Sequence, residues 1–431
     1  MLLPYLGLIG LALAWHLIRR TRREQRHART LAESLAAGLN EPPSLHPVVD
    51  PARCIGSGSC VKVCPEGALG MVGGKATLIN ASACIGHGAC HAACAFDAIS
   101  LVFGTAQRGI DIPLLRPNFE TNVPGLFIAG ELGGMGLIRK AAEQGRQAME
   151  AIVQRGRAPA DAQWLDVLIV GAGPAGMSAG LSAVAHGLRH TMLEQETSLG
   201  GSIFHYPRQK IAMTAPVVLA LVGKVAMTEI SKEQLLAFWH GVTQQHRLQI
   251  AFGQRMERIE PVAGGFVVHS RERQWLARSV LLAIGRRGTP RTLDVPGEAL
   301  AKVTYRLVDP QQYQGQQVLV VGGGDSALEA AIALAETPGT EVTLSYRSAA
   351  FSRVKAKNRE RLAALQSTGR IDVQLCSQIE RIEAQSVSLK TADGSRRTLP
   401  NDTVIVCAGG VLPTPLLKDI GIRFETKHGT A

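Results

Sequence analysis

The residues with the clearest chemical potential are six cysteines near the start of the chain. The sequence has eight cysteines, and these six lie between positions 54 and 94. They form two copies of one pattern, Cys-Ile-Gly-x-Gly-x-Cys-x3-Cys, which begins at Cys54 and again at Cys84. An internal repeat of this kind indicates a pseudo-symmetric unit. Such grouping is typical of metal ligands rather than of a secreted disulfide framework.

The spacing resembles the two-cluster ferredoxin pattern of bacteria, Cys-x2-Cys-x2-Cys-x3-Cys-Pro, in which the fourth cysteine of each run ligates the other cluster. The second cysteine of each run is replaced here, by Ser57 and by His87, and Ala95 stands where the last proline is usual. The resemblance implies two ligand sets: Cys54, Cys60 and Cys94 with Ser57 as a possible fourth ligand, and Cys84, Cys90 and Cys64 with His87.

The type of cluster stays open at this point. Soft thiolates suit iron–sulfur clusters, and a serine or histidine in fourth place ligates weakly or leaves one iron labile. Each site could hold a [4Fe–4S] cluster with one non-cysteine ligand, or a [3Fe–4S] cluster. Zinc is the alternative, but zinc sites usually show Cys-x2–4-Cys pairs, which this spacing does not match.

A glycine-rich turn further along the chain predicts a dinucleotide-binding unit. The apolar run 165–170 indicates a buried parallel strand, and the fingerprint 171–176 follows it, with an alanine-rich helix behind. The glycines permit a tight turn, close approach of a pyrophosphate and packing of the helix on the strand. An acid that ends the next strand suits the ribose hydroxyls. The expected contacts are Gly171, Gly173, Pro174, Ala175, Gly176 and Glu194.

A second unit of the same kind follows nearer the C-terminus. The strand expected at 317–321 turns through a glycine-rich loop into another alanine-rich helix. The next strand, 341–345, ends in Tyr346-Arg347 rather than in an acid. An arginine here suits the 2′-phosphate of NADP better than the free hydroxyls of NAD. NADPH is therefore preferred over NADH, with expected contacts from Gly322, Gly324, Asp325, Ser326, Ala327, Arg347 and Arg353.

Two such units in one chain resemble the low-molecular-weight thioredoxin reductase branch of the two-dinucleotide-binding flavoproteins, over about residues 106–424. The resemblance implies that the first unit binds FAD and the second binds NAD(P)H, and that Gly201 lies in the family's turn near the flavin. The second unit lacks the redox-active Cys-x-x-Cys of thioredoxin reductases. Electrons must therefore leave the flavin by a route other than a dithiol.

One element of this family stands out of its usual order. These flavoproteins normally end with a segment of pattern Thr-x-x-Pro-Gly that closes over the flavin. Here the run from Thr121 to Glu131 carries that pattern but precedes the first glycine turn. Circular permutation explains the order, since folds tolerate it where their termini lie close together; an unrelated linker is the alternative. We expect Gly130 and Glu131 to contact the flavin, and a short tether to keep the cysteines beside it.

The N-terminus combines an apolar run with a basic segment. Residues 1–18 are apolar except near Trp15 and His16, and about 17 to 20 such residues can span a bilayer. Six arginines against one glutamate follow by position 29, which contributes +5 to the chain's +11 charge. This order predicts a single-pass anchor in the cytoplasmic membrane, with the catalytic domains in the cytoplasm. A shorter amphipathic or buried helix is the alternative.

Together these features predict an α/β fold class: two Rossmann-like domains, for FAD and NAD(P), plus a small α+β ferredoxin-like domain and one N-terminal transmembrane helix. Only 4% of the residues are aromatic, which argues against stacking platforms for single-stranded nucleic acid. The expected units are a transmembrane anchor (1–18), a basic linker (19–48), the ferredoxin-like iron–sulfur domain (49–104), the permuted FAD-closing segment (105–160), the FAD-binding domain (161–290), the NAD(P)-binding domain (291–408) and a return to the FAD domain (409–431).

The predicted function is electron transfer from NAD(P)H through FAD to iron–sulfur clusters and on to a redox partner. Hydride transfer followed by single-electron steps demands no acid–base side chain, so no catalytic residue is predicted. The partner is expected to be a protein, such as a multihaem cytochrome or a quinone enzyme, and the chain is expected to form a homodimer. The alternatives are reverse flow from a reduced carrier to NAD(P)+, a redox sensor or assembly subunit, and a disulfide reductase that uses an outside thiol.

Overall fold

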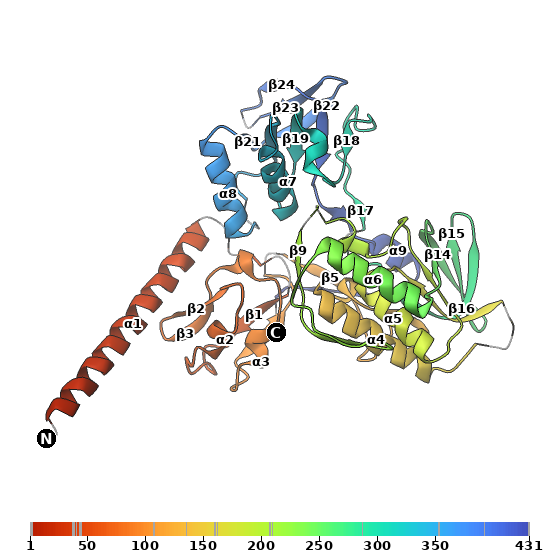
Figure 1. Ribbon diagram of the computed structural model, residues 1–431, viewed down its shortest axis with the longest axis horizontal. Helices are drawn as coiled ribbons and strands as arrows, with labels where there is room; N and C mark the ends of the chain where they lie inside the picture. The colour runs from red at the N-terminus through yellow and green to blue at the C-terminus, as the bar shows by residue number, and fades with distance from the viewer. Residues whose placement is uncertain are drawn as a thin grey trace.

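The computed structural model describes residues 3–36, 39, 41–42, 45–106, 108–134, 136–158, 161, 163–206, 208, 210–286, 288–351, 354–391 and 393–429. A long N-terminal helix leads into a small unit of short strands, which lies against a body of two sheet domains (Figure 1). Both sheet domains combine parallel strands with covering helices, so the α/β part of the predicted fold class is present.

The first helix, α1 (Leu3–Ala36), is continuous through both the apolar run and the arginines. Within the described residues, no helix is long and apolar enough to cross a membrane. The predictions of a transmembrane helix, and of a single-pass location in the cytoplasmic membrane with the catalytic domains in the cytoplasm, are therefore wrong. The physical reason is length: between Leu3 and the first arginine, Arg19, the apolar part of α1 is shorter than the roughly 20 residues that a span requires.

The later half of α1 packs on a hairpin of the cysteine unit, formed by β2 (Leu69–Val72) and β3 (Lys75–Leu78). The backbone N–H of Met71 donates to His27 Nδ1 at 2.9 Å, and the N–H of Gly74 donates to Glu24 Oε1 at 2.6 Å. These bonds satisfy backbone donors at the hairpin's outer edge, which would otherwise be open. They fix α1 to the cysteine unit.

The cysteine unit is organised around a two-stranded ladder. Strand β1 (His46–Val49) pairs antiparallel with β4 (Ile99–Val102), so the first and last strands of the unit lie side by side. Each cysteine run passes through a one-turn helix, either α2 (Ser59–Lys62) or α3 (Ala89–Ala92). The two halves of the unit thus follow the same order of loop, helical turn and strand.

The first Rossmann-like domain has a seven-stranded sheet in the order β13-β8-β7-β16-β15-β14, and β6 pairs with residues 280–282 of β16, beyond the part that pairs with β15. Strand β6 runs parallel to β16, with Phe127 opposite Leu281, although it precedes the glycine turn in the chain. Helices α4 and α5 pack closely, because Gly145 has no Cβ to collide with the carbonyl oxygen of Ala175. The elements are β6 (Leu126–Ile128), α4 (Ile138–Gln154), β7 (Trp164–Val170), α5 (Pro174–Ala185), β8 (His190–Leu193), α6 (Lys232–His246), β13 (Ile250–Ala251), β14 (Met256–Val262), β15 (Gly265–Ser270) and β16 (Gln274–Leu282).

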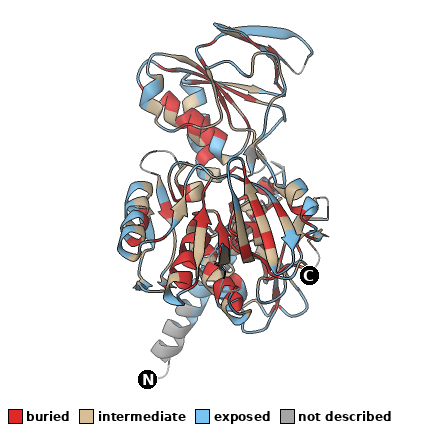
Figure 2. Ribbon diagram, turned by 90° about the vertical axis from the view of Figure 1, so that its right-hand side faces the viewer, coloured by how far each residue is buried: buried red, intermediate tan, exposed pale blue. Residues whose placement is uncertain are grey.

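The core of this domain lies between its sheet and its helices. Figure 2 shows buried residues concentrated along these strands and on the inner sides of the helices. Phe127 of β6 and Leu168 of β7 are fully buried. Each such side chain contributes roughly 1.5–3 kcal/mol by leaving water, so β6 is an integral strand rather than a surface attachment.

The second Rossmann-like domain has a five-stranded parallel sheet in the order β18-β25-β19-β20-β21 and a separate three-stranded antiparallel sheet, β22-β23-β24. Helix α7 follows the second glycine loop. The elements are β18 (Val303–Thr304), β19 (Gln317–Val321), α7 (Asp325–Ala335), β20 (Glu341–Tyr346), α8 (Ala356–Ser367), β21 (Ile371–Leu375), β22 (Gln378–Ile382), β23 (Ser386–Lys390), β24 (Arg396–Pro400) and β25 (Thr403–Val406).

Smaller strands connect these parts. Strand β27 (Phe424–Lys427), near the C-terminus, pairs antiparallel with β5 (Ile110–Pro113), just after the cysteine unit. The N–H of Gly429 donates to the carbonyl oxygen of Phe103 at 2.8 Å. The remaining elements are the 3-10 turns at Ala81–Ala83, Glu131–Gly133, Gly201–Ile203 and Pro310–Tyr313, β9 (Ile211–Met213), β10 (Val217–Leu219), β11 (Gly223–Val225), β12 (Glu229–Ser231), β17 (Thr289–Pro290), β26 (Gly410–Val411) and α9 (Thr414–Asp419).

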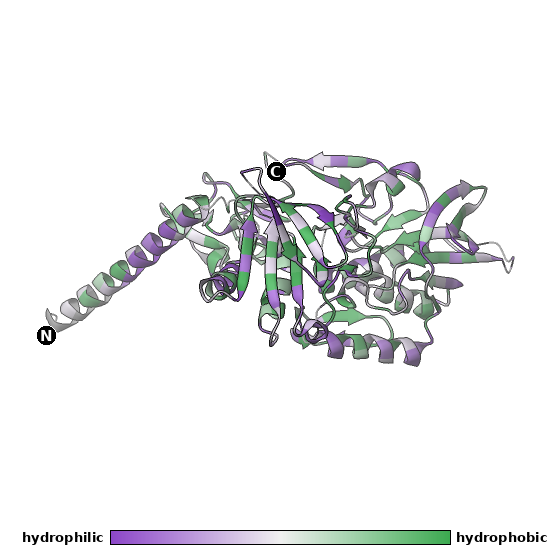
Figure 3. Ribbon diagram, turned by 90° about the horizontal axis from the view of Figure 1, so that it is seen from above, coloured by the Kyte–Doolittle hydropathy of each residue, from purple (hydrophilic) through white to green (hydrophobic). Residues whose placement is uncertain are grey.

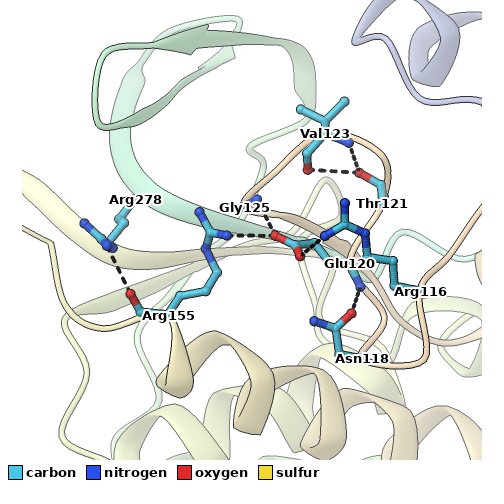
Figure 4. Close-up of polar contacts among 8 residues, drawn as sticks. All are labelled: Arg116, Asn118, Glu120, Thr121, Val123, Gly125, Arg155 and Arg278. Atoms are coloured by element: carbon cyan, nitrogen blue, oxygen red, sulfur yellow. Dashed lines mark hydrogen bonds and ion pairs between the residues drawn. The ribbon is translucent and has the colours of Figure 1, made fainter.

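A single carboxylate joins the Thr-x-x-Pro-Gly turn to the body of the first domain (Figure 4). Glu120 Oε1 accepts from the N–H of Gly125 and from Arg155 Nη1, both at 2.8 Å, and Oε2 accepts from Arg116 Nη1 at 3.3 Å. The Glu120 side chain is only 7% exposed. Because Arg155 follows α4, this group of contacts ties the turn before β6 to the helix that comes after it.

Candidate functional site

Three thiols and one imidazole line a pocket in the cysteine unit. Its walls include Cys64, Cys84, Cys90 and His87, together with Leu101 of β4. Cys84 and Cys90 are buried and Cys64 is partly buried. This is the set that the ferredoxin resemblance assigned to the second cluster. The structure therefore brings all four of these predicted residues together.

The other three cysteines form a neighbouring group. Cys54 and Cys94 are close enough to Cys60 to influence its ionisation, and Cys54 and Cys60 are both buried. Ser57 differs from His87, because it is exposed and its Oγ lies 3.4 Å from Ser59 Oγ. The two halves of the unit thus supply the same thiols but different fourth side chains.

Glycine makes both cysteine loops possible. Gly56 and Gly58 have φ of +78° and +69°, and Gly86 and Gly88 have +79° and +75°, a region that L side chains rarely adopt. Gly58 and Gly88 then occupy the N-cap positions of α2 and α3. The repeated Gly-x-Gly therefore gives both loops the same path, which places Cys60 and Cys90 on the first turn of their helices.

The thiols are held in an environment that disfavours their ionisation in the absence of a metal. Burial raises the pKa of Cys84 to about 11, and it also raises the pKa of Cys60 and of Cys90. Neighbouring thiols act in the same direction. A metal centre that binds thiolates would reverse this penalty. Among the described residues, no three His, Cys, Asp or Glu side chains lie close enough to hold a single metal ion. The donor set, three soft thiols per site, suits a larger iron–sulfide cluster.

The first glycine loop has the geometry of a dinucleotide site. Gly171 has φ of +107°, and a Cβ there would lie 2.5 Å from the carbonyl oxygen of Ala283. A Cβ at Gly176 would collide with the carbonyl oxygen of Gly171. The loop and α5 can therefore pack this closely only because position 176 is a glycine. Gly173 is the N-cap of α5, whose N-terminus offers positive potential to a pyrophosphate.

Glu194 directly follows β8, beside this loop, and is 4% exposed. Its Oε2 accepts from the N–H of Ala172 at 2.8 Å, and its Oε1 accepts from the N–H of Glu196 at 3.0 Å. Burial raises the pKa of Glu194 above its usual range, and these amide bonds offset only part of that effect. The carboxylate is therefore fixed next to the loop, at the place where an adenosine ribose would lie.

The closing segment lies against the same loop. Gly130 donates its N–H to Gln144 Oε1 at 2.9 Å, and a Cβ at Gly130 would lie 3.1 Å from Ala175 Cβ. A Cβ at Gly201 would lie 3.1 Å from Gly173 Cα. Glu131 lines the same cavity as these residues. The structure thus brings Gly130, Glu131 and Gly201 to the first glycine loop.

The second glycine loop repeats this arrangement. Gly322 has φ of +144°, and a Cβ there would collide with the carbonyl oxygen of Cys407. Asp325 Oδ1 accepts from the N–H of Lys355 at 3.0 Å and from Asn358 Nδ2 at 2.7 Å. Arg347 is exposed directly after β20, whereas Arg353 lies outside the described residues.

Residues from both Rossmann-like domains line one continuous cavity. Of the predicted nucleotide contacts that the structure describes, Gly176 and Ala327 do not line it, because they pack behind their loops. Those that do are Gly130, Glu131, Gly171, Gly173, Pro174, Ala175, Glu194, Gly201, Gly322, Gly324, Asp325, Ser326 and Arg347.

The sequence did not indicate a set of polar contacts between the two domains at this cavity. Lys210 Nζ lies 2.7 Å from Glu329 Oε2 of α7. Arg306 Nη1 lies 2.7 Å from His205 Nδ1, and its Nη2 lies 3.5 Å from Glu196. These partners are far apart in the chain and lie in no motif, so only the folded arrangement reveals them.

Two family models match the chain at these sites. The model described as pyridine nucleotide-disulphide oxidoreductase matches residues 168–430, which is more than half of the chain. The chain belongs to this family. The model described as a 4Fe-4S dicluster domain matches residues 46–95. The protein is an oxidoreductase whose cofactors are FAD, NAD(P)H and iron–sulfur clusters.

Similar proteins include two named ferredoxin–NADP reductase. The one from Paracidovorax citrulli is 30% identical over 284 residues, covering 61% of this chain and 76% of the relative. The one from Thermus thermophilus is 29% identical over 274 residues, covering 60% and 77%. The solved structure of bacillithiol disulfide reductase Bdr from Staphylococcus aureus is 24% identical, covers 61% of this chain and 81% of its own, and has a TM-score of 0.54, which supports the fold.

Proposed function

We propose that this enzyme moves electrons from NADPH through FAD to two cluster sites on the same chain, and from there to a separate redox protein. The observation that carries the proposal is the contact between the cysteine unit and the closing segment. The ring of Phe103, just after β4, lies so close to Gly134 that a Cβ there would be 2.6 Å from Phe103 Cζ. Gly134 ends the short turn that begins at Glu131, which lines the nucleotide cavity.

The residues proposed to bind each group are those that the fold brings together. FAD, when bound, accepts a hydride equivalent and releases its electrons singly. The chain contributes by position: the N-terminus of α5 faces the pyrophosphate, the Glu194 carboxylate binds the ribose hydroxyls, and the Arg347 guanidinium pairs with a 2′-phosphate. The proposed cluster ligands are Cys54, Cys60 and Cys94 with Ser57, and Cys64, Cys84 and Cys90 with His87.

We propose further that the closing segment occupies the place of a C-terminal segment in a circularly permuted enzyme. Two observations support this. Strand β6 joins the first sheet by pairing with β16, and the matches leave part of each relative uncovered, with 76% and 77% of their lengths aligned. The permutation would tether the cysteine unit directly to the strand beside the flavin. A short tether raises the effective concentration of one redox centre at the other.

The test is an anaerobic titration with NADPH and separately with NADH, followed by optical and EPR spectra. We expect NADPH to bleach the flavin and then to produce cluster signals, whose form distinguishes [3Fe–4S] from [4Fe–4S]. Cys60→Ser should alter the cluster signals, and the control Cys376→Ser, in the second Rossmann-like domain, should not. A flavin that reduces while intact clusters stay oxidised would contradict the proposal.

Reverse flow is a second candidate, favoured by the name ferredoxin–NADP reductase that both relatives carry. In this direction a reduced carrier delivers electrons to the clusters and NADP+ accepts the hydride. The test is to reduce the clusters chemically and to measure the rate at which NADPH forms. A rate above that of the forward reaction would favour this direction, since the two directions share the same site.

A further inference from the structure

The position of each cluster site along the β1–β4 ladder shows which site lies nearer to the flavin domain. At one end, where Val49 pairs with Ile99, the chain enters the loop of Cys54, and Cys94 lies just before β4. Toward the other end, Leu101 lines the pocket of the second thiol group. Strand β4 then continues directly to Phe103 at the Gly134 contact. With about 3.3 Å per residue, Leu101 lies roughly 7 Å from that contact and Ile99 roughly 13 Å.

The helical turns follow the same order. Helix α3, which carries Cys90, packs on β4, whereas α2, which carries Cys60, packs on β2, the strand that contacts α1. The Cys64, Cys84 and Cys90 group therefore lies on the reductase side of the unit. The Cys54, Cys60 and Cys94 group lies on the side of the hairpin and α1.

Two large exposed apolar side chains lie close in the chain to cysteines of the outer group. Ile55, next to Cys54, is 64% exposed, and Phe96, two residues after Cys94, is 48% exposed. Their two loops lie side by side, because Arg53 Nη1 donates to the carbonyl oxygen of Asp97 at 3.4 Å. We call Ile55 and Phe96 the apolar rim. Large exposed apolar side chains beside a redox centre are a feature of protein docking sites.

A basic surface adjoins the apolar rim. The cysteine unit itself is balanced, with three basic and three acidic residues between positions 49 and 104. Helix α1 is basic, with six exposed arginines against two glutamates, and one of these, Glu24, contacts the N–H of Gly74. Gly74 in turn touches Gly56, next to Ile55. Figure 3 shows the hydrophilic stretch of α1 that carries these arginines: Arg19, Arg20, Arg22, Arg23, Arg26 and Arg29.

We infer that the Cys54, Cys60 and Cys94 site is the exit for electrons, and that its partner is an acidic one-electron carrier protein that docks on the apolar rim under attraction from the α1 arginines. This inference rests on the proposed function. Each docking event oxidises the outer site by one electron and reduces the carrier by one. One NADPH supplies two electrons and leaves as NADP+ with release of a proton, so it reduces two carrier molecules. Weak electron-transfer complexes of this kind use small, electrostatically steered interfaces.

The test measures electron transfer from the NADPH-reduced enzyme to a small acidic [2Fe–2S] ferredoxin in a stopped-flow instrument, with basic cytochrome c as the comparison probe. The double variant Ile55→Ser/Phe96→Ser should lower the second-order rate constant for the ferredoxin about tenfold. The control Val262→Ser, an exposed apolar position on β14, should leave it unchanged. Arg22→Glu/Arg26→Glu should also lower the rate at low salt, with a smaller effect at high salt because salt screens the attraction.

The outcomes separate this inference from the proposed function. Cluster EPR after NADPH reduction should be the same in the variants and in the wild type, which also shows that the cysteine unit is intact. If NADPH does not reduce the clusters of the wild type, the proposed function fails. If it does, but the rim variants pass electrons to the ferredoxin at the wild-type rate, the exit assignment is wrong. If Arg22→Glu/Arg26→Glu lowers the rate to cytochrome c as much as the rate to the ferredoxin, the preference for an acidic partner is wrong.

Discussion

Glu120 is the residue whose removal should most directly loosen the closing segment. It accepts from both the turn N–H of Gly125 and the guanidinium of Arg155, and Arg155 is one-third exposed. Glu120→Gln removes the charge that pairs with the arginine, at an expected cost of about 2 kcal/mol. The temperature at which flavin fluorescence appears on heating should fall by about 4–8 °C.

Glu150 provides the matched control for Glu120. It also pairs with an arginine, Arg146, but its side chain is 46% exposed. Exposed pairs within a helix contribute about 0.5 kcal/mol or less, so Glu150→Gln should shift flavin release only slightly. Equal shifts in the two variants would show that burial of the Glu120 carboxylate has no special role.

Glu194 should give the FAD-free protein a distinct pH dependence. Its folded pKa is raised by burial above its unfolded value of about 4.3. Its contribution to stability is therefore fully present below pH 4.3 and is lost as pH rises through the raised folded pKa. Relative to Glu194→Gln, the wild-type apoprotein should lose stability as pH rises above about 4.3, as measured by urea unfolding. The exposed control Glu272→Gln should show the same pH dependence of stability as the wild type. If Glu194→Gln also shows the wild-type pH dependence, Glu194 is not its source.

At the scale of residues, the sequence predicted contacts that depend on local spacing. Gly171 and Glu194 come together because strand, turn and helix follow one another in the chain, and the same local order places Gly322 in the second glycine loop. Lys210 and Arg306 were missed, because each meets its partner only across the two domains. The sequence also did not show that Ser57 is exposed while His87 lines a pocket, since exposure depends on how the loops pack.

At the scale of elements, Gly176 and Gly241 offer a matched pair of helix substitutions. In Gly176→Ala, the new methyl group on α5 would collide with the carbonyl oxygen of Gly171, so we expect a loss of at least about 3 kcal/mol and a flavin-free product. Gly241 lies on α6 with open space around it, and Gly241→Ala should stabilise the protein by about 0.5–1 kcal/mol. Flavin content and thermal unfolding measure both. Full flavin content in Gly176→Ala would disprove the close packing of loop and helix.

The elements also show where sequence patterns mislead. The apolar run at the N-terminus resembled a membrane span, but the structure continues it as one helix through the arginines to Ala36. Hydropathy alone does not report where a helix ends or what its later turns contact. The contacts of Glu24 and His27 with the hairpin arise from tertiary packing, so no local sequence pattern predicts them.

At the scale of the whole molecule, β27 should act as a strap on the cysteine unit. It pairs with β5, and Gly429 bonds to Phe103 beside the Gly134 contact. A chain that stops at position 423 should keep NADPH reduction of the flavin, but transfer from flavin to clusters should fall at least tenfold, because a looser tether lowers effective concentration. Stopped-flow absorbance separates the two steps. The control Glu425→Ala/Lys427→Ala changes only exposed side chains of β27 and should behave like the wild type. Unchanged transfer in the truncated chain would exclude the strap.

The sequence assigned 409–431 to the first Rossmann-like domain but did not reveal that β27 pairs with β5. A two-stranded ladder between distant segments leaves no repeat or spacing in the sequence. Thr426 Oγ1 and Asp111 Oδ1, which bond at 2.7 Å, are 315 residues apart in the chain. The Thr-x-x-Pro-Gly turn, in contrast, has a recognisable pattern, and β6, which follows it, pairs with β16 of the first sheet.

The pairing of β5 with β27 also sets an order of events during synthesis. The cysteine unit and β6 leave the ribosome first, and β6 has no sheet to join until β16 has been made. Contacts between such distant segments form late, since a long loop must close first. Strand β5 pairs later still, because its partner β27 lies more than 300 residues further along the chain. If synthesis stopped before β27, the released protein would have no partner for β5, and this unpaired strand edge would expose it to aggregation and degradation.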